Sequence, residues 1–250
     1  MCWRIVRVEG DGSIKLLLED STYECNNASY NGNWSIGNAI AFGYDSNNKA
    51  DFLGYTGGLA DELKNFQVNN ETPAGTLTKK VYDTYNGADL GDYLKPDTWC
   101  YDHNVTETSG SNEYYGAYTR VVTNKQPSNV CTGTKISKYR DNTNMYVGTL
   151  TADEIAFAGG NEATNTNYYI MNTYAQSNEL KWWALSPYGW YDEISWGTAF
   201  SVNYAGYLNS SVVSNGHDRV ARPAVTLKIG TTLSNVAGQD GTKDHPYVIN

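Results

Sequence analysis

The sequence is poor in basic residues and has no long apolar run. Lysine and arginine number 18 against 27 aspartate and glutamate residues, so the formal net charge is −9. Binding to phosphate groups needs a basic surface, so this balance argues against a nucleic-acid partner and against docking on an anionic membrane. No apolar run approaches the roughly 20 residues that cross a bilayer, which argues against direct membrane insertion.

Histidine and cysteine are too scattered for the common catalytic centres. The three histidines stand at positions 103, 217 and 245, and none belongs to a recognisable nucleophile motif. No two cysteines have the C-x-x-C spacing of zinc knuckles or thioredoxin-like sites. Asp192 and Glu193 are neighbours, so in a strand they would point to opposite faces and would not form a glycosidase pair. No cofactor is expected, and a structural calcium ion stays open because Asp and Asn are abundant.

The four cysteines, Cys2, Cys25, Cys100 and Cys131, predict the compartment. An even number in a polar chain favours disulfides and an extracellular or cell-surface location. Pairing in sequence order is the simplest of three connectivities, and the alternative is four buried thiols in a reducing cytosol. Met1 directly precedes a predicted strand, so we expect an export signal or anchor to be missing from this sequence.

Local patterns in the first half predict one clear element, a β-hairpin over residues 2–20. Apolar residues alternate on either side of the turn signal Glu-Gly-Asp-Gly at 9–12. Residues 21–58 are rich in Asn and Gly and offer few regular signals. The remaining expectations for this half are a loop over 101–135 and helices over about 76–85 and 88–94.

The second half predicts a short helix followed by strands. Thr151 and Glu154 have the spacing of a capping box, so a helix is expected to begin there and to end at the glycines at 159 and 160. Short strands are predicted over residues 182–185, 199–203, 207–213 and 221–229.

The C-terminal third is enriched in aromatic residues. Residues 182–222 contain nine Trp, Tyr or Phe in 41 positions, against 13% in the whole chain. The predicted core residues of this segment are Trp182, Trp183, Phe200, Val202, Leu208 and Val212. The other rings stand among Asn, Ser, Asp and Gly, a mixture of rigid aromatic and adaptable polar groups that is typical of antibody-like binding surfaces.

A binding surface is therefore predicted within residues 188–219. Its candidate ligand-binding residues are Tyr188, Trp190, Tyr191, Asp192, Trp196, Asn203, Tyr204, Tyr207, Asn209, Ser211, Asn215, His217 and Asp218. The expected apolar anchors are Trp190, Tyr191, Tyr204 and Tyr207. The alternative is that these rings only fill the core of a β-rich domain.

Six runs of the sequence resemble a surface module common in gut Firmicutes. They are CWRIVR at 2–7, GDGS at 10–13, YVGTLTADE at 146–154, WALSP at 183–187, ARPAVTL at 221–227 and GTKDHPYVI at 241–249. The resemblance implies a single α+β domain over residues 1–250 with the C-type-lectin-like fold of formylglycine-generating enzymes. Such a domain has mixed and antiparallel sheets with two or three short helices, and we expect its N-terminal hairpin to lie beside the C-terminal strands.

The same module is similar to the variable proteins of diversity-generating retroelements, in which mutagenesis at adenines rewrites Asn-type codons. This implies a non-catalytic adhesin or receptor-binding module of a bacterial surface, pilus or phage, with a diversified segment over 182–222. Its ligand would be a protein or glycan on a cell surface. Trp190 and Trp196 cannot be reached from an Asn codon in this way, so they are expected as contacts rather than as diversified positions.

Two other functions stay open on this scaffold. One is an enzyme, either a glycosidase or an oxygenase, although the oxygenase would need a pair of cysteines in the C-terminal half and residues 132–250 contain none. The other is a structural pilus or envelope subunit that buries the aromatic segment in an assembly interface.

Overall fold

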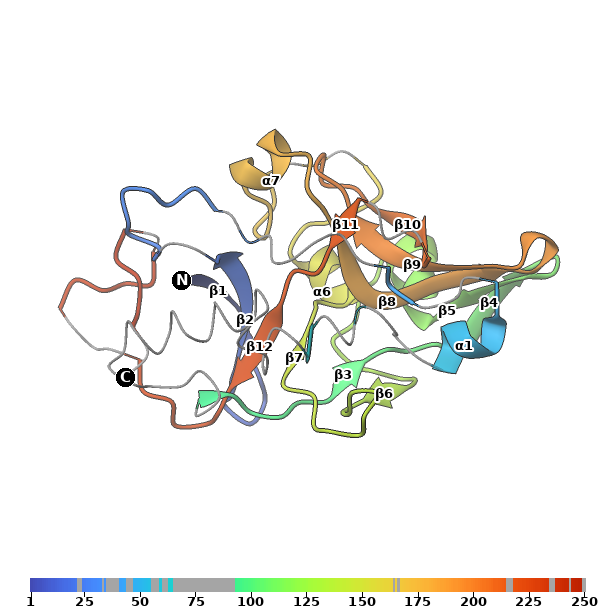
Figure 1. Ribbon diagram of the computed structural model, residues 1–250, viewed down its shortest axis with the longest axis horizontal. Helices are drawn as coiled ribbons and strands as arrows, with labels where there is room; N and C mark the ends of the chain where they lie inside the picture. Colours follow the sequence, from blue (N-terminus) through green and yellow to red (C-terminus); the bar gives the residue numbers. More distant parts are fainter. Residues whose placement is uncertain are drawn as a thin grey trace.

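Two main β-sheets and a few short helices form the protein, in a computed structural model (Figure 1). The architecture is therefore α+β, with mixed, largely antiparallel sheets, as predicted. The structure describes residues 1–21, 24–32, 34, 41–43, 47–54, 59, 63–64, 93–163, 165, 167–214, 218–233, 237–242 and 244–248. The helix predicted over 76–85 and most of the one predicted over 88–94 lie outside these residues.

The first sheet joins the two ends of the chain. Its strand order is β1 (Cys2–Val8), β2 (Ile14–Asp20), β12 (Ala224–Leu227) and β7 (Val147–Gly148). Strands β1 and β2 form the predicted hairpin, and Asp11 Oδ1 closes its turn by accepting the backbone N–H of Ser13 at 2.9 Å. Strand β12 pairs antiparallel with β2, which confirms that the N-terminal hairpin lies beside a C-terminal strand.

The second sheet carries most of the aromatic segment. Its strand order is β10 (Leu208–Val212), β9 (Trp196–Val202), β8 (Lys181–Tyr191), β5 (Asn112–Tyr115) and β4 (Val105–Ser109), and β11 (Arg219–Val220) pairs parallel with β8. A short pair, β3 (Trp99–Cys100) and β6 (Lys135–Ile136), stands apart from it. The β8–β9 and β4–β5 hairpins extend in the same direction (Figure 1). The predicted C-terminal strands are thus confirmed, although β8 is longer than expected.

The prediction of a loop over 101–135 is wrong. This segment contains β4 and β5, followed by α5 (Gly116–Tyr118) and a π-helical turn (Thr119–Thr123). Strand β4 is at the edge of the sheet, and four of its five residues are exposed. A strand that is exposed on both faces lacks the apolar alternation by which strands are found in a sequence.

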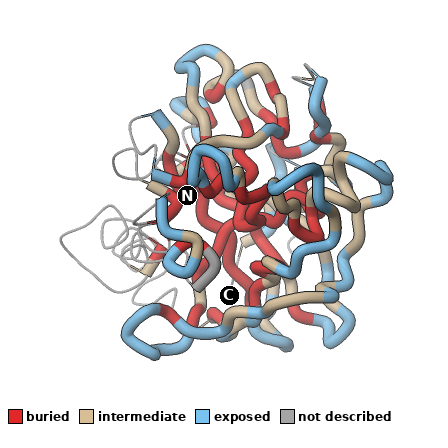
Figure 2. The backbone as a smooth tube through the Cα atoms, turned by 90° about the vertical axis from the view of Figure 1, so that its right-hand side faces the viewer, coloured by how far each residue is buried: buried red, intermediate tan, exposed pale blue. Residues whose placement is uncertain are grey.

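Large aromatic side chains fill the core between the elements, and Figure 2 shows the buried backbone gathered at the centre of the molecule. Trp182 and Trp183 are fully buried, as predicted. The predicted core residues Phe200, Val202 and Leu208 are buried as well. Val212 is only half-buried, and the core position belongs instead to the next residue, Val213, which follows the end of β10.

Two disulfides join the cysteines in sequence order. Cys2 is bonded to Cys25, and Cys100 is bonded to Cys131. The simplest of the three connectivities is therefore confirmed, and it fits the expected extracellular location. Among the residues that the structure describes, no helix has both the length and the apolar character needed to span a membrane.

The described residues also include the short helices α1 (Lys49–Gly54), α6 (Ala152–Phe157) and α7 (Thr173–Ser177). Helix α6 begins with the predicted capping box: Thr151 Oγ1 accepts the N–H of Glu154 at 3.1 Å, and Glu154 Oε2 accepts the N–H of Thr151 at 2.8 Å. The other oxygen of Glu154 forms ion pairs with Lys15 at 2.9 Å and Arg7 at 2.8 Å. A buried carboxylate thus fixes α6 to the first sheet.

We expect this carboxylate to make the stability depend on pH. Burial acts to raise the pKa of Glu154, but the charges of Lys15 and Arg7 outweigh it and hold the pKa below the ordinary value of 4.5. A lowered pKa in the folded state stabilises the protein above the unfolded value, and this stabilisation is lost as the pH falls through the folded value. The free energy of unfolding, measured by urea titration from about pH 7 to about pH 3, should therefore decrease.

Glu154→Gln should flatten this dependence, because the amide does not titrate. It should also lower the free energy of unfolding at neutral pH, since Lys15 loses its buried partner. An identical slope in the variant and the parent protein would show that Glu154 does not contribute to the acid sensitivity.

Candidate ligand-binding face

Five aromatic residues meet on one side of the second sheet, and we call them the aromatic face. The rings of Tyr114 and Tyr118 are stacked with 4.2 Å between their centroids, and Tyr188 meets Tyr118 edge-on at 4.8 Å. The ring centroids of Tyr191 and Tyr114 are 6.1 Å apart. Trp196 is paired directly opposite Tyr191, and opposite residues of an antiparallel pair share a face of the sheet.

A β-bulge decides which rings of β8 reach this face. The register with β9 shifts between residues 187 and 189, and this shift places Tyr188 against Phe200, with 4.8 Å between the ring centroids. Trp190 stacks instead on Phe52 of α1, at 6.1 Å. Residues two positions apart in a regular strand share a face, but the bulge puts Tyr188 and Trp190 on opposite faces.

Trp190 therefore belongs to the core and not to an exposed surface, contrary to its expected role as an anchor. Its side chain is only 4% exposed, and its indole N–H donates to Asp192 Oδ1 at 3.2 Å. Gly197, opposite Trp190 in β9, leaves room for this packing, because a Cβ there would stand 2.7 Å from the ring of Phe52. Asp192, another candidate, thus holds the indole of Trp190 in place.

The aromatic face is partly accessible to solvent. Trp196 is 45% exposed, while Tyr114, Tyr118 and Tyr191 are half-buried and Tyr188 is buried at the floor of the face. Burial raises the pKa of Tyr191 to about 12, and the neighbouring Tyr114 contributes to the shift. The hydroxyl group of Tyr191 is therefore protonated at neutral pH, so it offers the face an apolar ring together with a neutral hydrogen-bonding group.

A second group of candidates lies at the opposite end of β9. Asn203 Oδ1 accepts the N–H of Ala205 at 2.9 Å and that of Tyr207 at 3.1 Å, so this amide builds the β9–β10 turn. Tyr204 in the same turn is 38% exposed. A strand rises about 3.3 Å per residue, so the length of β9 puts this turn roughly 20 Å from Trp196. The single surface predicted from the sequence is divided between the two ends of the strand.

The remaining candidates do not join the aromatic face. Asn209 is exposed and Ser211 is half-buried on β10, and both are opposite β9 residues of the other face. Asp218 forms ion pairs with Lys181 at 2.7 Å and with Arg219. Asn215 and His217 lie outside the described residues.

Tyr114 and Tyr118 are the residues of this face that the sequence analysis missed. Both belong to the segment that was predicted to be a loop. The turn signal Ser-Gly-Ser-Asn at 109–112, with Thr on one side and Glu-Tyr-Tyr on the other, was the available indication of a hairpin.

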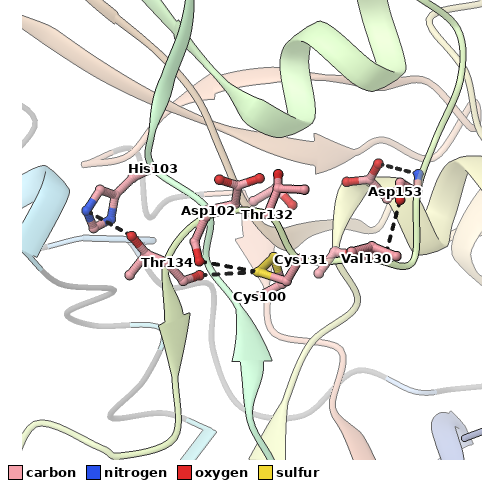
Figure 3. Close-up of a disulfide and its surroundings, with 12 residues drawn as sticks. Cys100, Asp102, His103, Val130, Cys131, Thr132, Thr134 and Asp153 are labelled. Atoms are coloured by element: carbon pink, nitrogen blue, oxygen red, sulfur yellow. Dashed lines mark hydrogen bonds between the residues drawn. A yellow bond between two sulfur atoms is a disulfide. The ribbon is translucent and has the colours of Figure 1, made fainter. Parts of the chain in front are cut away.

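A buried polar cluster next to the Cys100–Cys131 disulfide supports this part of the face. Arg120, two residues after Tyr118, donates to Asp153 through Nε and Nη2, each at 2.8 Å, and to Asp102 through Nη1 at 2.8 Å. Figure 3 shows Asp102 and Asp153 close to this disulfide. Arg120 thereby fixes the turn that carries Tyr118 to the start of α6.

A separate cavity of about 500 Å³ is lined by residues of the first sheet and by residues 239–242 and 246–248. Trp3, Ile14, Leu16 and Tyr247 are among the residues that line it. No residue of the aromatic face and no predicted ligand-binding residue contributes to this lining. Within the described part of the chain, no group of three or more His, Cys, Asp or Glu side chains is placed to hold a metal ion.

No protein-family model, curated protein or solved structure matches this chain. The class of the protein is therefore inferred from its geometry.

The opposite locations of the two tryptophans give a direct test of this geometry. Trp190→Ala should lower the free energy of unfolding by about 3–5 kcal/mol, because it leaves a cavity against Phe52. Trp196→Ala should cost less than about 1 kcal/mol, because its ring is already half in solvent. Urea unfolding of both variants measures the difference, and equal losses would contradict the assigned faces.

Proposed function

We propose that this protein is a non-catalytic ligand-binding module, an adhesin or receptor-binding domain of a cell surface, and that the aromatic face is its binding surface. The observation that carries the proposal is the continuity of partly exposed rings on one side of a sheet whose other side is packed. Tyr114, Tyr118 and Tyr191 are half-buried, and their rings lie next to one another. Trp196, which is 45% exposed, is paired opposite Tyr191. Adjoining exposed rings are characteristic of interaction sites.

The chemistry of these side chains suits recognition. Tyr and Trp have few rotatable bonds, so they contribute a large contact area at a low cost in conformational entropy. The disulfide and the Arg120 cluster further restrict the backbone that carries Tyr118. A binding surface that is ordered before it meets its ligand loses less entropy on binding.

We further propose that the fold is C-type-lectin-like and that residues 182–222 are diversified, as the resemblance to retroelement variable proteins implies. The pairing of the N-terminal hairpin with β12 supports this proposal. The segment supplies Tyr188, Tyr191 and Trp196 to the aromatic face, while Tyr114 and Tyr118 come from outside it. The partner is a protein or a glycan on another cell surface.

Sequencing of sister loci tests the diversification. Substitutions should concentrate in adenine-containing codons of 182–222 and leave the codons of Tyr114 and Tyr118 unchanged. Substitutions scattered evenly along the gene would refute it.

Screening the whole chain on glycan and protein arrays tests the binding function. Tyr191→Ala should lower the affinity for a ligand found in this way about thirtyfold, the loss typical of an anchor residue. Tyr204→Ala is the matched control, because it removes an exposed tyrosine from the far end of β9 and should leave binding unchanged. Circular dichroism and melting temperatures establish that both variants are folded.

The control also defines the contrary results. A ligand that loses affinity with Tyr204→Ala but not with Tyr191→Ala would place the binding surface at the β9–β10 turn. The absence of any ligand on either array, with self-association of the chain in solution, would favour a structural subunit instead.

A further inference from the structure

The aromatic face includes a carboxylate that has no cationic partner in the described part of the chain. Glu107 of β4 is paired opposite Tyr114, so the two side chains share this face. Glu107 Oε2 accepts the hydroxyl groups of Thr123 at 2.8 Å and Thr119 at 3.4 Å. Glu113, in the neighbouring strand, forms an ion pair with Lys49 at 2.7 Å, whereas no such pair involves Glu107 among the described residues.

A second carboxylate lies toward the β10 side of the face. Leu208 donates its N–H to the carbonyl of Asn161 at 2.8 Å, which places Glu162 beside the sheet. Glu162 is exposed. Its negative charge contributes to the raised pKa values of Tyr118 and Tyr188, after the larger effect of their burial. Two carboxylates therefore give this group of rings a negative potential.

Elsewhere the protein combines a carboxylate and an aromatic ring with a cation of its own. Lys15 lies 4.5 Å from the ring centroid of Trp99 and pairs with Glu154 at 2.9 Å.

Arg222 repeats this arrangement in the core. Its guanidinium lies 4.8 Å from the ring of Trp34, and it pairs with Glu19 at 2.8 Å. Both groups are complete: a cation is attracted to the electron-rich face of a ring and to a negative charge at the same time.

On the aromatic face the ring and the carboxylate are present, but no Lys or Arg lies over any of its rings in the described part of the chain. We infer that the ligand supplies the missing cation, and that the face binds an arginine side chain presented by a partner protein. This inference rests on the proposed binding function and names its ligand class. A planar guanidinium stacks on tyrosine and also donates to a carboxylate, which a compact ammonium group does less well.

The position of the face suits a side chain projecting from a larger molecule. The rings are carried by the β4–β5 and β8–β9 hairpins and by α5, and Trp196, at the start of β9, is 45% exposed. The net charge of −9 favours approach by a basic partner, since opposite net charges accelerate encounter.

The experiment is an NMR titration of the whole chain, with labelled tyrosine and tryptophan, by two small probes. N-acetyl-arginine methylamide carries the guanidinium, and N-acetyl-citrulline methylamide has nearly the same shape without the charge. The arginine probe should shift the signals of Tyr114, Tyr118 and Tyr191 and leave that of Tyr204 unchanged. It should bind about two- to fivefold more tightly than the citrulline probe.

Two variants isolate the carboxylate. Glu107→Gln should weaken arginine binding about two- to fivefold, as is typical of a solvent-accessible charge pair. Glu179→Gln, which removes an exposed carboxylate in the turn after α7, should have no effect. Raising the salt concentration to about 0.5 M should reduce the preference for arginine, because salt screens such a pair.

The contrary results separate this inference from the proposed function. Equal shifts by both probes would show that the face binds without regard to charge, which overturns the inference and leaves the binding function standing. No shift of the aromatic face by either probe would also overturn the arginine preference, and the array screen would then judge the binding function alone. An unchanged affinity for the arginine probe in Glu107→Gln would show that this carboxylate does not contribute to binding, which contradicts the inference.

Discussion

The first turn of α6 is the point at which the two halves of the fold are fixed to each other. Its two adjacent acids point in different directions: Glu154 pairs with Lys15 and Arg7 of the N-terminal hairpin, and Asp153 pairs with Arg120 below the aromatic face. In Figure 1 the helix lies between the two sheets. Both carboxylates are buried, so each depends on its cation for compensation of the desolvation cost. Ion pairs on two neighbouring residues therefore join the N-terminal hairpin to the turn that follows Tyr118.

This arrangement explains why a short helix can organise a much larger structure. Helix α6 has six residues and would not be stable alone. Its capping box, the ion pairs of Asp153 and Glu154, and the hydrogen bond from the N–H of Ala152 to Ser186 Oγ, at 3.0 Å, hold it in place. The hydrogen bond from Leu185 to the carbonyl of Leu150, at 2.8 Å, adds a direct link to β8. Strand β8 then carries Tyr188 and Tyr191 into the aromatic face.

The sequence predicted those features that arise from neighbouring residues. The hairpin turn at 9–12, the capping box at Thr151 and the buried pair Trp182 and Trp183 all follow from local chemistry. It failed where a partner distant in the sequence decides the outcome. The bulge after residue 187 puts Trp190 on the opposite face from Tyr188. The pattern of apolar residues within β8 gives no sign of this shift. The edge strand β4 has little buried surface, so hydrogen bonds to β5 define it and apolar spacing does not.

The aromatic face, like the fold, followed from the sequence only in part. Aromatic enrichment located Tyr188, Tyr191 and Trp196 correctly on one face, because these residues flank a single hairpin. The same enrichment also included Tyr204 and Tyr207, since a residue count along the chain cannot distinguish the two ends of a strand. The polar candidates Asn203 and Asp218 turned out to have structural partners in the turn and in an ion pair.

The aromatic face is assembled from two hairpins and the short helix α5, and the proposed diversification would affect only one of the hairpins. The β8–β9 hairpin lies inside the rewritten segment, whereas Tyr114, Tyr118 and Glu107 lie outside it and would pass unchanged to every descendant. Under this scheme the specificity for the partner protein changes between descendants, while the preference for one kind of side chain is retained. The part of the face formed by Tyr114, Tyr118 and Glu107 would then stay constant, while the adjoining β8–β9 residues would vary between generations.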